Sequence, residues 1–343
     1  MSKKQRSQNR RRVTLQAVAD FAGVNRVTAA VALGQSPQGG TRVSDATRQR
    51  VLDAALELGY APNAWARALR GERTNIIGYY AGYEPLDAHM PFVAAILEGL
   101  QRSCREHNQD LMLFGSFTRD SVDSIYATLA GGKIDGLVLL PTPRSPVMDR
   151  LFDSHLPVVA IANAHPAVPS VVVDDSTGAR LIAVHLAQKG HQRILYRSHQ
   201  DYRSSTVRRL DSFMTAATAL GLTVTVTHEA DTAGHRLAAE EIAILRQPVA
   251  LRPTAAVCWM DLNAHQLLTY CAENELQVPG DLAIVGFDGI PQPIQPRRAL
   301  TTVRAPWADV AAKAVETLLA LLNGVPVEPE YRFPIELVVG DTT

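Results

Sequence analysis

The chain has 343 residues, of which 46% are hydrophobic and 20% are charged. This length allows a small module joined to a larger body with a buried core. No run of about 18 apolar residues occurs, so we expect no membrane-spanning helix. The charged start of the chain is not followed by the apolar segment of a secretory or twin-arginine signal, so a cytoplasmic protein is expected.

The charges are unevenly distributed, although the 34 basic and 34 acidic residues balance. Residues 1–73 hold 13 basic and 5 acidic residues, a net charge of +8, and the rest of the chain carries −8. A basic head on an acidic body is typical of a polyanion-binding module fused to a sensor. Six like charges within residues 1–12, without apolar anchors, indicate a disordered basic tail.

The cysteines give no sign of a metal centre or a disulfide framework. Cys104, Cys258 and Cys271 lie in apolar stretches and lack metal-ligand spacing. We expect buried, reduced thiols, and no cofactor is predicted.

Short capped helices are predicted at the start of the chain. Thr14 can cap a first helix, which Gly23 ends, and Asn25 can cap a second. Ser44 can cap a third helix with apolar residues at core spacing. A helix, a glycine turn and a second helix with a polar outward face form the helix-turn-helix pattern, which places a helix in the major groove of B-DNA.

A short helical segment follows this head. Asn63 can cap two turns of helix and Gly71 can end them. Such a segment is too short to be stable alone, so we interpret it as a hinge.

From Asn75 onward, short apolar runs alternate with helical stretches, which predicts parallel sheets with helices on both faces. Two such series indicate two similar lobes, and a last helix is predicted over Trp307–Leu322. The expected strands are Ile76–Tyr80, Leu111–Phe114, Leu137–Leu140, Val158–Ile161, Ile194–Tyr196, Val224–Thr227, Ala255–Trp259 and Leu282–Phe287. The expected helices between them include Phe92–His107, Val122–Ala130, Ala179–Gln188, Val207–Leu220, Arg236–Leu245 and Asn263–Asn274.

Several motifs of the chain form a recognisable set. In the head they are Val13–Thr28, Val43–Arg48 and Leu58–Asn63, with Ala66, Arg67 and Leu69. In the body they are Thr74–Gly78, Asp135–Leu139, Gly190-His191, Val285–Asp288 and Leu300–Val303. In residues and in order, these motifs resemble the lactose/galactose-repressor (LacI/GalR-type) family of bacterial transcription regulators. The resemblance covers residues 13–340.

This resemblance implies an α/β protein with an N-terminal all-α helix-turn-helix head and a two-lobed, periplasmic-binding-protein-like body of parallel sheets flanked by helices. The expected divisions are a disordered basic tail, a DNA-binding domain, a hinge helix with linker, and an effector-binding and dimerisation domain. Their bounds are 1–12, 13–61, 62–74 and 75–343. The family forms homodimers on pseudo-palindromic double-stranded DNA, and no membrane partner is expected. Localisation is expected to be cytoplasmic and nucleoid-associated.

The resemblance also implies a set of DNA-binding residues. On the second helix, Arg26, Val27, Ala30 and Val31 would face base edges, and Leu69 would pry open a central base step. The full set is Thr14, Asn25, Arg26, Val27, Thr28, Ala30, Val31, Thr47, Tyr60, Asn63, Ala66 and Leu69. Asn25 and Val31 depart from the family's usual residues, and Ala30 and Val31 cannot hydrogen-bond a base. Arg26 is therefore the main candidate for reading guanine.

A ligand site is expected between the lobes, just after the strands. The predicted contacts are Phe92, Asn163, Arg203, Ser205, Arg209, Trp259, Asp261 and Asp288. For Asp261, a helix cap is an equal alternative, and Asp175 is expected to cap the helix starting at Ser176. Two arginines favour a carboxylate or phosphate on the ligand, so a sugar or sugar acid is preferred.

Alternatives remain at this stage. No GxGxxG, Walker A or GxSxG motif occurs, which disfavours an enzyme. An extracytoplasmic solute-binding protein would share the body but would have no use for residues 13–70. Within the regulator class, a repressor is preferred, with an effector-dependent activator or a purine-type co-repressor-binding regulator as alternatives. No leucine-heptad tail follows Tyr331, so a dimer is expected.

Overall fold

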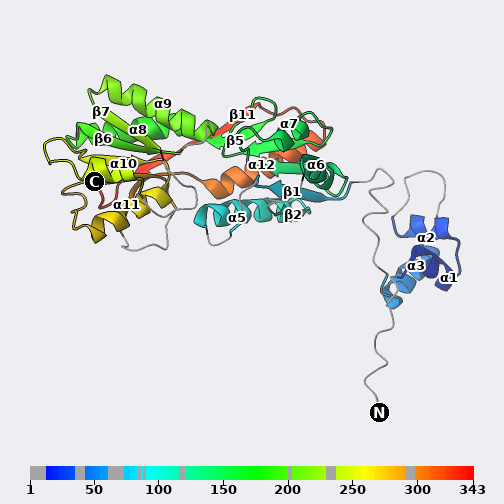
Figure 1. Cartoon of the computed structure of the whole chain (residues 1–343). Helices are drawn as coiled ribbons and strands as arrows, with labels where there is room; N and C mark the ends of the chain where they lie inside the picture. Colours follow the sequence, from blue (N-terminus) through cyan, green and yellow to red (C-terminus); the bar gives the residue numbers. More distant parts are fainter. Residues whose placement is uncertain are drawn as a thin grey trace, which may run out of the picture. The chain divides into compact units, whose positions relative to one another are not determined.

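The computed structural model describes residues 13–34, 43–60, 73–82, 86–87, 90–115, 121–199, 203–228, 237–290 and 298–343. The chain divides into two compact units, Met1–Thr74 and Asn75–Thr343 (Figure 1). The predicted tail and the hinge residues Asn63, Ala66 and Leu69 lie outside the described residues.

The first unit contains α1 (Leu15–Phe21), α2 (Arg26–Ala32) and α3 (Asp45–Glu57). Their predicted caps are confirmed, because Thr14, Asn25 and Ser44 each accept a hydrogen bond from a backbone N–H of the following first turn. Small apolar side chains from all three helices form the core of this unit. They include Val18, Ala19, Ala29, Ala32, Val51, Ala54 and Ala55.

The first lobe of the body is built on a six-stranded parallel sheet with the order β11-β5-β4-β3-β1-β2. Its strands are β1 (Ile76–Tyr80), β2 (Asp110–Phe114), β3 (Gly136–Leu139), β4 (Val158–Ile161), β5 (Ser170–Val173) and β11 (Glu330–Phe333). Its helices are α5 (Pro91–Glu106), α6 (Val122–Ala130), α7 (Pro146–Phe152) and α12 (Trp307–Leu322).

Alternating side chains on these strands cover both faces of the sheet. Ile77 and Val138 pack with residues of α5 and α12, whereas Tyr80 and Leu137 pack with residues of α6 and α7. Both faces are therefore buried, which explains why the strands read as continuous apolar runs.

The second lobe repeats this design, with the strand order β12-β10-β9-β8-β6-β7. Its strands are β6 (Arg193–Ser198), β7 (Thr223–His228), β8 (Ala255–Cys258), β9 (Ala283–Asp288), β10 (Thr301–Arg304) and β12 (Glu336–Val338), of which β12 alone pairs antiparallel. Its helices are α8 (Asp175–Gln188), α9 (Ser204–Ala219), α10 (Ala239–Leu245) and α11 (Asp261–Glu273). In Figure 1, α8 and α9 cover one face of this sheet and α11 lies on the other.

The chain crosses between the lobes at three places. It leaves the first sheet after β5 to enter α8, returns after β10 into α12, and crosses again between β11 and β12. α12 belongs to the first lobe, because it packs on α5 and on β3, β4 and β5. Each lobe is therefore assembled from segments far apart in the sequence.

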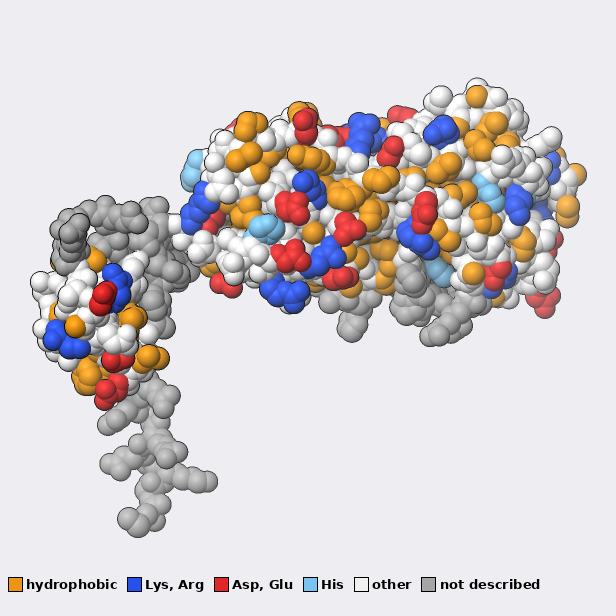
Figure 2. Space-filling view, turned by 180° about the vertical axis from the view of Figure 1, so that it is seen from behind, with side chains coloured by type: hydrophobic (Ala, Val, Ile, Leu, Met, Phe, Trp, Pro, Cys, Tyr) orange, Lys and Arg blue, Asp and Glu red, His pale blue; other side chains and the backbone are white. Residues whose placement is uncertain are grey.

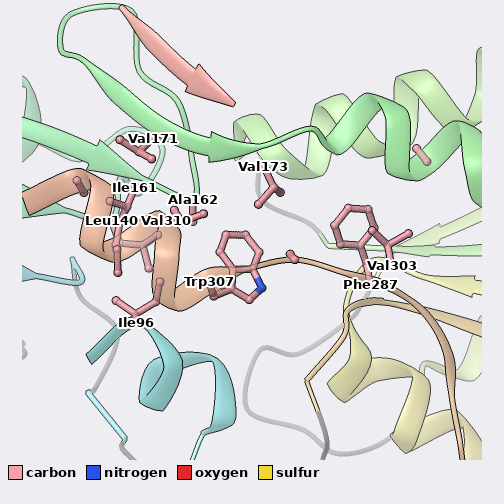
Figure 3. Close-up of a cluster of buried hydrophobic side chains, with 14 of the residues drawn as sticks. Ile96, Leu140, Ile161, Ala162, Val171, Val173, Phe287, Val303, Trp307 and Val310 are labelled. Atoms are coloured by element: carbon pink, nitrogen blue, oxygen red, sulfur yellow. The ribbon is translucent and has the colours of Figure 1, made fainter. Parts of the chain in front are cut away.

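One apolar cluster continues from the first lobe into the second. Figure 3 shows the Trp307 ring between first-lobe side chains such as Ile161 and Val310 and the second-lobe residues Phe287 and Val303. Trp307 is 3% exposed and also meets the Phe92 ring edge-on at 5.0 Å. The predicted ligand wall Phe92 thus packs on the residue that joins the lobes.

The structure corrects several expected elements. β5, β10, β11, β12 and α7 were not expected, and α8 begins four residues before Ala179. The strand that was expected to extend to Trp259 ends at Cys258. These strands are three or four residues long, and the burial that stabilises them comes from neighbours distant in sequence.

Candidate functional site

The first candidate site is the outward surface of α2. Gly23 turns the chain between α1 and α2 with a φ of 65°, a conformation that glycine adopts without strain. The Asn25 Oδ1 atom then accepts from the Thr28 N–H at 2.7 Å, and the Thr14 Oγ1 atom accepts from the Ala17 N–H at 3.2 Å. These caps use acceptor atoms, so the Thr14 hydroxyl proton and the Asn25 amide protons remain available as donors.

The two faces of α2 differ sharply. Ala29 and Ala32 are buried in the core, whereas Arg26 is exposed and Val27 is 59% exposed. The remaining predicted α2 contacts, Thr28, Ala30 and Val31, are half-buried. The helix is held by its small apolar face, and of the predicted base-reading side chains it leaves Arg26 and Val27 exposed to solvent.

The other predicted head residues lie on or beside α3. Thr47, in its first turn, is tied to the Ser44 hydroxyl, and the half-buried Tyr60 packs against the core. Arg48, which the sequence did not single out, donates to the Ala32 carbonyl at 3.1 Å. This bond caps the carboxyl end of α2 from a neighbouring helix, so α2 is fixed at both ends.

The second candidate site surrounds Arg209, on α9 in the second lobe. Arg209 is 3% exposed and donates to Asp175 Oδ1 at 2.7 Å and to the Trp259 carbonyl at 2.6 Å. Its guanidinium lies 3.7 Å from Asp288 Oδ1 and 3.6 Å above the centroid of the Phe287 ring. One buried cation therefore faces two carboxyl groups.

Burial dominates the electrostatics of these carboxyl groups. It raises the pKa of Asp175 and that of Asp288 above the usual range, although the Arg209 charge opposes both shifts. Asp175 Oδ2 makes no hydrogen bond within the described part of the chain. The Trp307 indole N–H lies close enough to Asp288 to lower its pKa but forms no well-aligned hydrogen bond.

Asp288 also has an unusual backbone. It adopts a φ of 123°, a region that residues with side chains rarely occupy. Such strain often accompanies functional positions. Ala162, at the end of β4, has a φ of 61°, so strained residues end a strand in each lobe.

The expectation for Asp175 is wrong in one respect. Asp174, not Asp175, caps α8, because Asp174 Oδ1 accepts from the Thr177 N–H at 3.0 Å. Asp175 is the first helical residue, is 2% exposed and holds Arg209 instead.

Asp261 neither caps α11 through its side chain nor faces open solvent. It is the first residue of α11 and is 1% exposed. Its carboxylate accepts from the Thr302 hydroxyl at 2.6 Å and from the Ile290 N–H at 2.9 Å. Burial raises the pKa of Asp261 to about 7. Asp261 thus ties α11 to the segments that follow β9 and form β10.

The remaining predicted ligand residues lie near these groups. Asn163, 4% exposed, accepts through Oδ1 from the Ser205 hydroxyl at 2.7 Å and from the Ser205 N–H at 3.2 Å. This contact joins the end of β4 to α9, which also carries Arg209 one turn further on. Trp259 is half-buried, and its ring lies 4.9 Å from that of His199.

A cavity of about 160 Å³ adjoins Asn163 and Arg203. Arg144, Ser145 and His165, which the sequence did not indicate, also line it. A larger hollow of about 720 Å³ has Thr302 and His265 in its lining. Of the predicted ligand residues, Asp261 alone lines this hollow.

The residues that the structure describes contain neither a metal cluster nor a membrane span. No group of three or more histidine, cysteine, aspartate or glutamate side chains there is arranged to hold a metal ion. None of the helices in that part of the chain has the length and apolar character needed to span a bilayer.

Parts of both units match models of known protein families. The family model described as "Bacterial regulatory proteins, lacI family" matches residues 14–63, and the model described as "Periplasmic binding protein-like domain" matches residues 183–343. The HTH-type transcriptional regulator Rv3575c of Mycobacterium tuberculosis is 30% identical over 348 residues, covering 93% of this chain and 94% of the relative. The HTH-type transcriptional repressor PurR of Vibrio vulnificus is 26% identical, covering 96% of this chain and 98% of the relative.

The fold also matches a solved structure. The crystal structure of the Lac repressor dimer bound to operator and the anti-inducer ONPF has a TM-score of 0.78 and 22% identity, covering 96% of this chain and 99% of that one. The relatives are transcriptional regulators rather than enzymes. The chain is therefore a DNA-binding transcription regulator that belongs to the lacI family of bacterial regulatory proteins.

Proposed function

We propose that this regulator is a repressor that works as a homodimer on a pseudo-palindromic operator and is switched by a small effector bound between its lobes. The PurR relative is named a repressor, and the Lac repressor of similar fold is a dimer bound to operator, which supports this proposal. Chromosomal DNA as the target supports a cytoplasmic, nucleoid-associated location.

The observation that carries the DNA-reading role is the outward face of α2. Arg26 is exposed there, with Val27 beside it. Among the residues predicted to face base edges, Arg26 has the long side chain that carries hydrogen-bond donors. A bidentate contact from arginine to guanine contributes ~1–3 kcal/mol of discrimination, and Val27 can touch a thymine methyl group. On the face of the body drawn in Figure 2, basic and acidic side chains are interspersed, so the uneven charge of the chain favours the head as the DNA contact.

The effector role rests on the Arg209 cluster. Arg209 bridges Asp175 and Asp288 across the start of α8 and the end of β9, next to the Asn163–Ser205 contact between the lobes. A ligand with hydroxyl groups can donate to the carboxylates, while Arg209 donates back to its oxygens. This chemistry suits a sugar or a sugar acid.

Closure of the lobes supplies the switch. A ligand shifts the equilibrium between open and closed bodies only through its different affinity for the two states. Contacts such as Asn163–Ser205 join the two lobes, so a ligand bound beside them favours one arrangement of the lobes over the other. When the arrangement of the lobes changes, the arrangement of the two heads in the dimer changes as well.

The operator test is selection of genomic fragments by the purified full chain at moderate salt. Arg26→Gln should lower affinity for the selected fragment about tenfold or more and relax preference at one base position of each half-site. Arg105→Gln, at an exposed position of α5 in the body, is the matched control and should leave the selection unchanged. The regulator role fails if the chain prefers no fragment over random duplex.

The effector test uses the recovered operator. Sugars and sugar acids suggested by the neighbouring genes are screened for a change in operator affinity. Asp288→Asn should abolish the response to the active compound while operator binding without it persists. An unchanged response in this variant would exclude the Arg209 cluster as the effector site.

A further inference from the structure

A side-chain ion pair joins the two lobes outside the Arg209 cluster. Arg208, on α9 of the second lobe, donates to Glu330 Oε1 at 3.1 Å and to Oε2 at 2.6 Å. Glu330 is the first residue of β11, which belongs to the sheet of the first lobe. Each terminal nitrogen of the guanidinium meets a different oxygen, which is the most specific way for arginine to hold a carboxylate.

An ion pair between lobes differs in consequence from one within a lobe. Arg102 of α5 pairs with Asp309 of α12, and both helices belong to the first lobe. Such a pair stays formed whether the lobes approach or separate. The Arg208–Glu330 pair, by contrast, depends on where the two lobes lie relative to each other.

Two further contacts connect the first turn of α9 to the first lobe. The Ser204 hydroxyl accepts from the Ala164 N–H at 2.7 Å, and the Ser205 N–H donates to Asn163 Oδ1 at 3.2 Å. Ala164 and Asn163 directly follow β4 and the residue after it. Helical residues three and four positions apart lie on the same side, so Arg208 extends the surface that carries Ser204 and Ser205. The amino-terminal half of α9 therefore contacts the first lobe along one side.

The position of Glu330 makes its ion pair sensitive to opening of the lobes. The chain leaves the first sheet just after Val173 and again after Phe333, and these two residues lie side by side in the register of β5 and β11. Glu330 precedes Phe333 by three residues, which is about 10 Å along the strand. A rotation of the lobes about these crossings therefore moves Glu330 relative to Arg208.

The pair is half-buried and charged. The Arg208 and Glu330 side chains are 29% and 21% exposed. Burial opposes ionisation of Glu330, but hydrogen bonds from Arg208 and Arg332 outweigh it and lower the pKa of Glu330 below its usual value. Arg332 contacts the same carboxylate from within β11. A partly exposed ion pair contributes modestly to stability, and salt weakens it further.

We propose that Arg208 and Glu330 form a salt-sensitive latch, which favours the arrangement in which α9 contacts the first lobe over arrangements in which the lobes separate. The inference deepens the proposed switch by lobe closure and rests on it for its functional role. The ligand proposed above lies beside the Asn163–Ser205 contact, so a latch that favours this contact also favours binding of the ligand.

Two backbone amides report on the latch. The Ala164 and Ser205 N–H groups each donate to a side chain of the opposite lobe, so separation of the lobes exposes both to exchange with solvent. Their exchange rates follow the opening equilibrium even when the open arrangement is rare. The test is therefore hydrogen exchange of the full chain, without DNA or effector, followed by mass spectrometry at single-residue resolution.

Arg208→Gln and Glu330→Gln should each speed the exchange of both amides about threefold, and the double variant should do no more than either single variant. Arg332→Gln is the matched control, because it removes an equal charge beside Glu330 from within the first lobe, and it should leave both rates unchanged. The Leu137 N–H, bonded to the Pro157 carbonyl inside the first lobe, should exchange equally in all chains.

Salt provides a second arm of the test. Raising potassium chloride from about 50 mM to about 500 mM should bring the wild type to the faster rate and leave Arg208→Gln unaffected. Wild-type rates in both Arg208→Gln and Glu330→Gln would overturn the proposal, as would an equal acceleration in Arg332→Gln. Glu330→Gln acts from the first lobe, so the test stands if Arg208→Gln fails to fold.

The latch and the regulator role can fail separately. Unchanged exchange in both latch variants of a chain that selects an operator refutes the latch alone. Accelerated exchange in a chain that prefers no genomic fragment refutes the regulator role alone.

Discussion

Arg197, in the middle of the second lobe, is an arginine with 1% exposure. Its guanidinium donates to Glu241 Oε1 at 2.7 Å and Oε2 at 3.2 Å, and to the Asn263 carbonyl at 2.7 Å. Glu241 also accepts from the Thr227 hydroxyl at 3.1 Å. Two charges are thus buried together, and their hydrogen bonds tie α10 and α11 to the sheet.

Removing one partner of this pair leaves an uncompensated buried charge. We predict that Glu241→Ala lowers the free energy of unfolding by ~3–5 kcal/mol in urea titrations. Glu336→Ala is the control, because its partner Arg304 and Glu336 itself are 58% and 64% exposed, and its effect should stay below ~1 kcal/mol. Equal effects in the two variants would contradict this account.

A second residue-scale prediction concerns Asp261 and pH. Burial raises its folded-state pKa to about 7, so the folded chain binds this proton more tightly than the unfolded chain does. The resulting stabilisation is complete below about pH 4 and is lost as the pH rises through 7. Relative to Asp261→Asn, the wild type should lose up to ~1.4 kcal/mol of stability per pH unit within this window.

The measurement is denaturant unfolding at closely spaced pH values. Asp309→Asn, on a side chain that is 57% exposed, is the control and should keep the wild-type slope. Parallel pH curves for the wild type and Asp261→Asn would show that this carboxyl group is not protonated preferentially in the folded chain.

At the scale of elements, the contact between α5 and α12 depends on one glycine. A Cβ atom on Gly99 would fall well inside contact distance of the Ala308 backbone, so the two helices meet there without an intervening side chain. Ala308 directly follows Trp307, which joins the lobes (Figure 3). The closeness of these helices therefore positions the interlobe cluster.

We predict that Gly99→Ala destabilises the body by ~1–3 kcal/mol, because α12 must shift away from α5. Thermal unfolding of the full chain, followed through near-ultraviolet circular dichroism, measures this change. Gly115→Ala is the matched control, since no atom lies within 4 Å of its added Cβ, and it should unfold like the wild type. A fully stable Gly99→Ala chain would mean that the helices separate at no cost.

At the scale of the whole molecule, the two compact units have separate cores. We predict that a fragment of residues 75–343 folds cooperatively and keeps the affinity of the full chain for the effector, but binds operator no better than random DNA. Calorimetry and fragment selection measure the two properties. A fragment that unfolds or loses the effector would show that the body depends on the head.

Local features of the chain could be predicted from sequence, and long-range ones could not. The Thr14 and Asn25 caps depend on residues three positions apart, so the pattern alone identified them. β11 was not expected, because it is defined by pairing with β5, some 160 residues earlier. The one-residue error at Asp175 has the same cause, since a contact with the distant residue Arg209 determines its role.

The three crossings of the chain between the lobes have a consequence for synthesis on the ribosome. The first lobe lacks α12 and β11 until almost the whole chain has emerged, so β5 exposes an unpaired edge throughout the translation of the second lobe. Nascent chains that stall before residue 330 should therefore require chaperones, even when the second sheet is nearly complete.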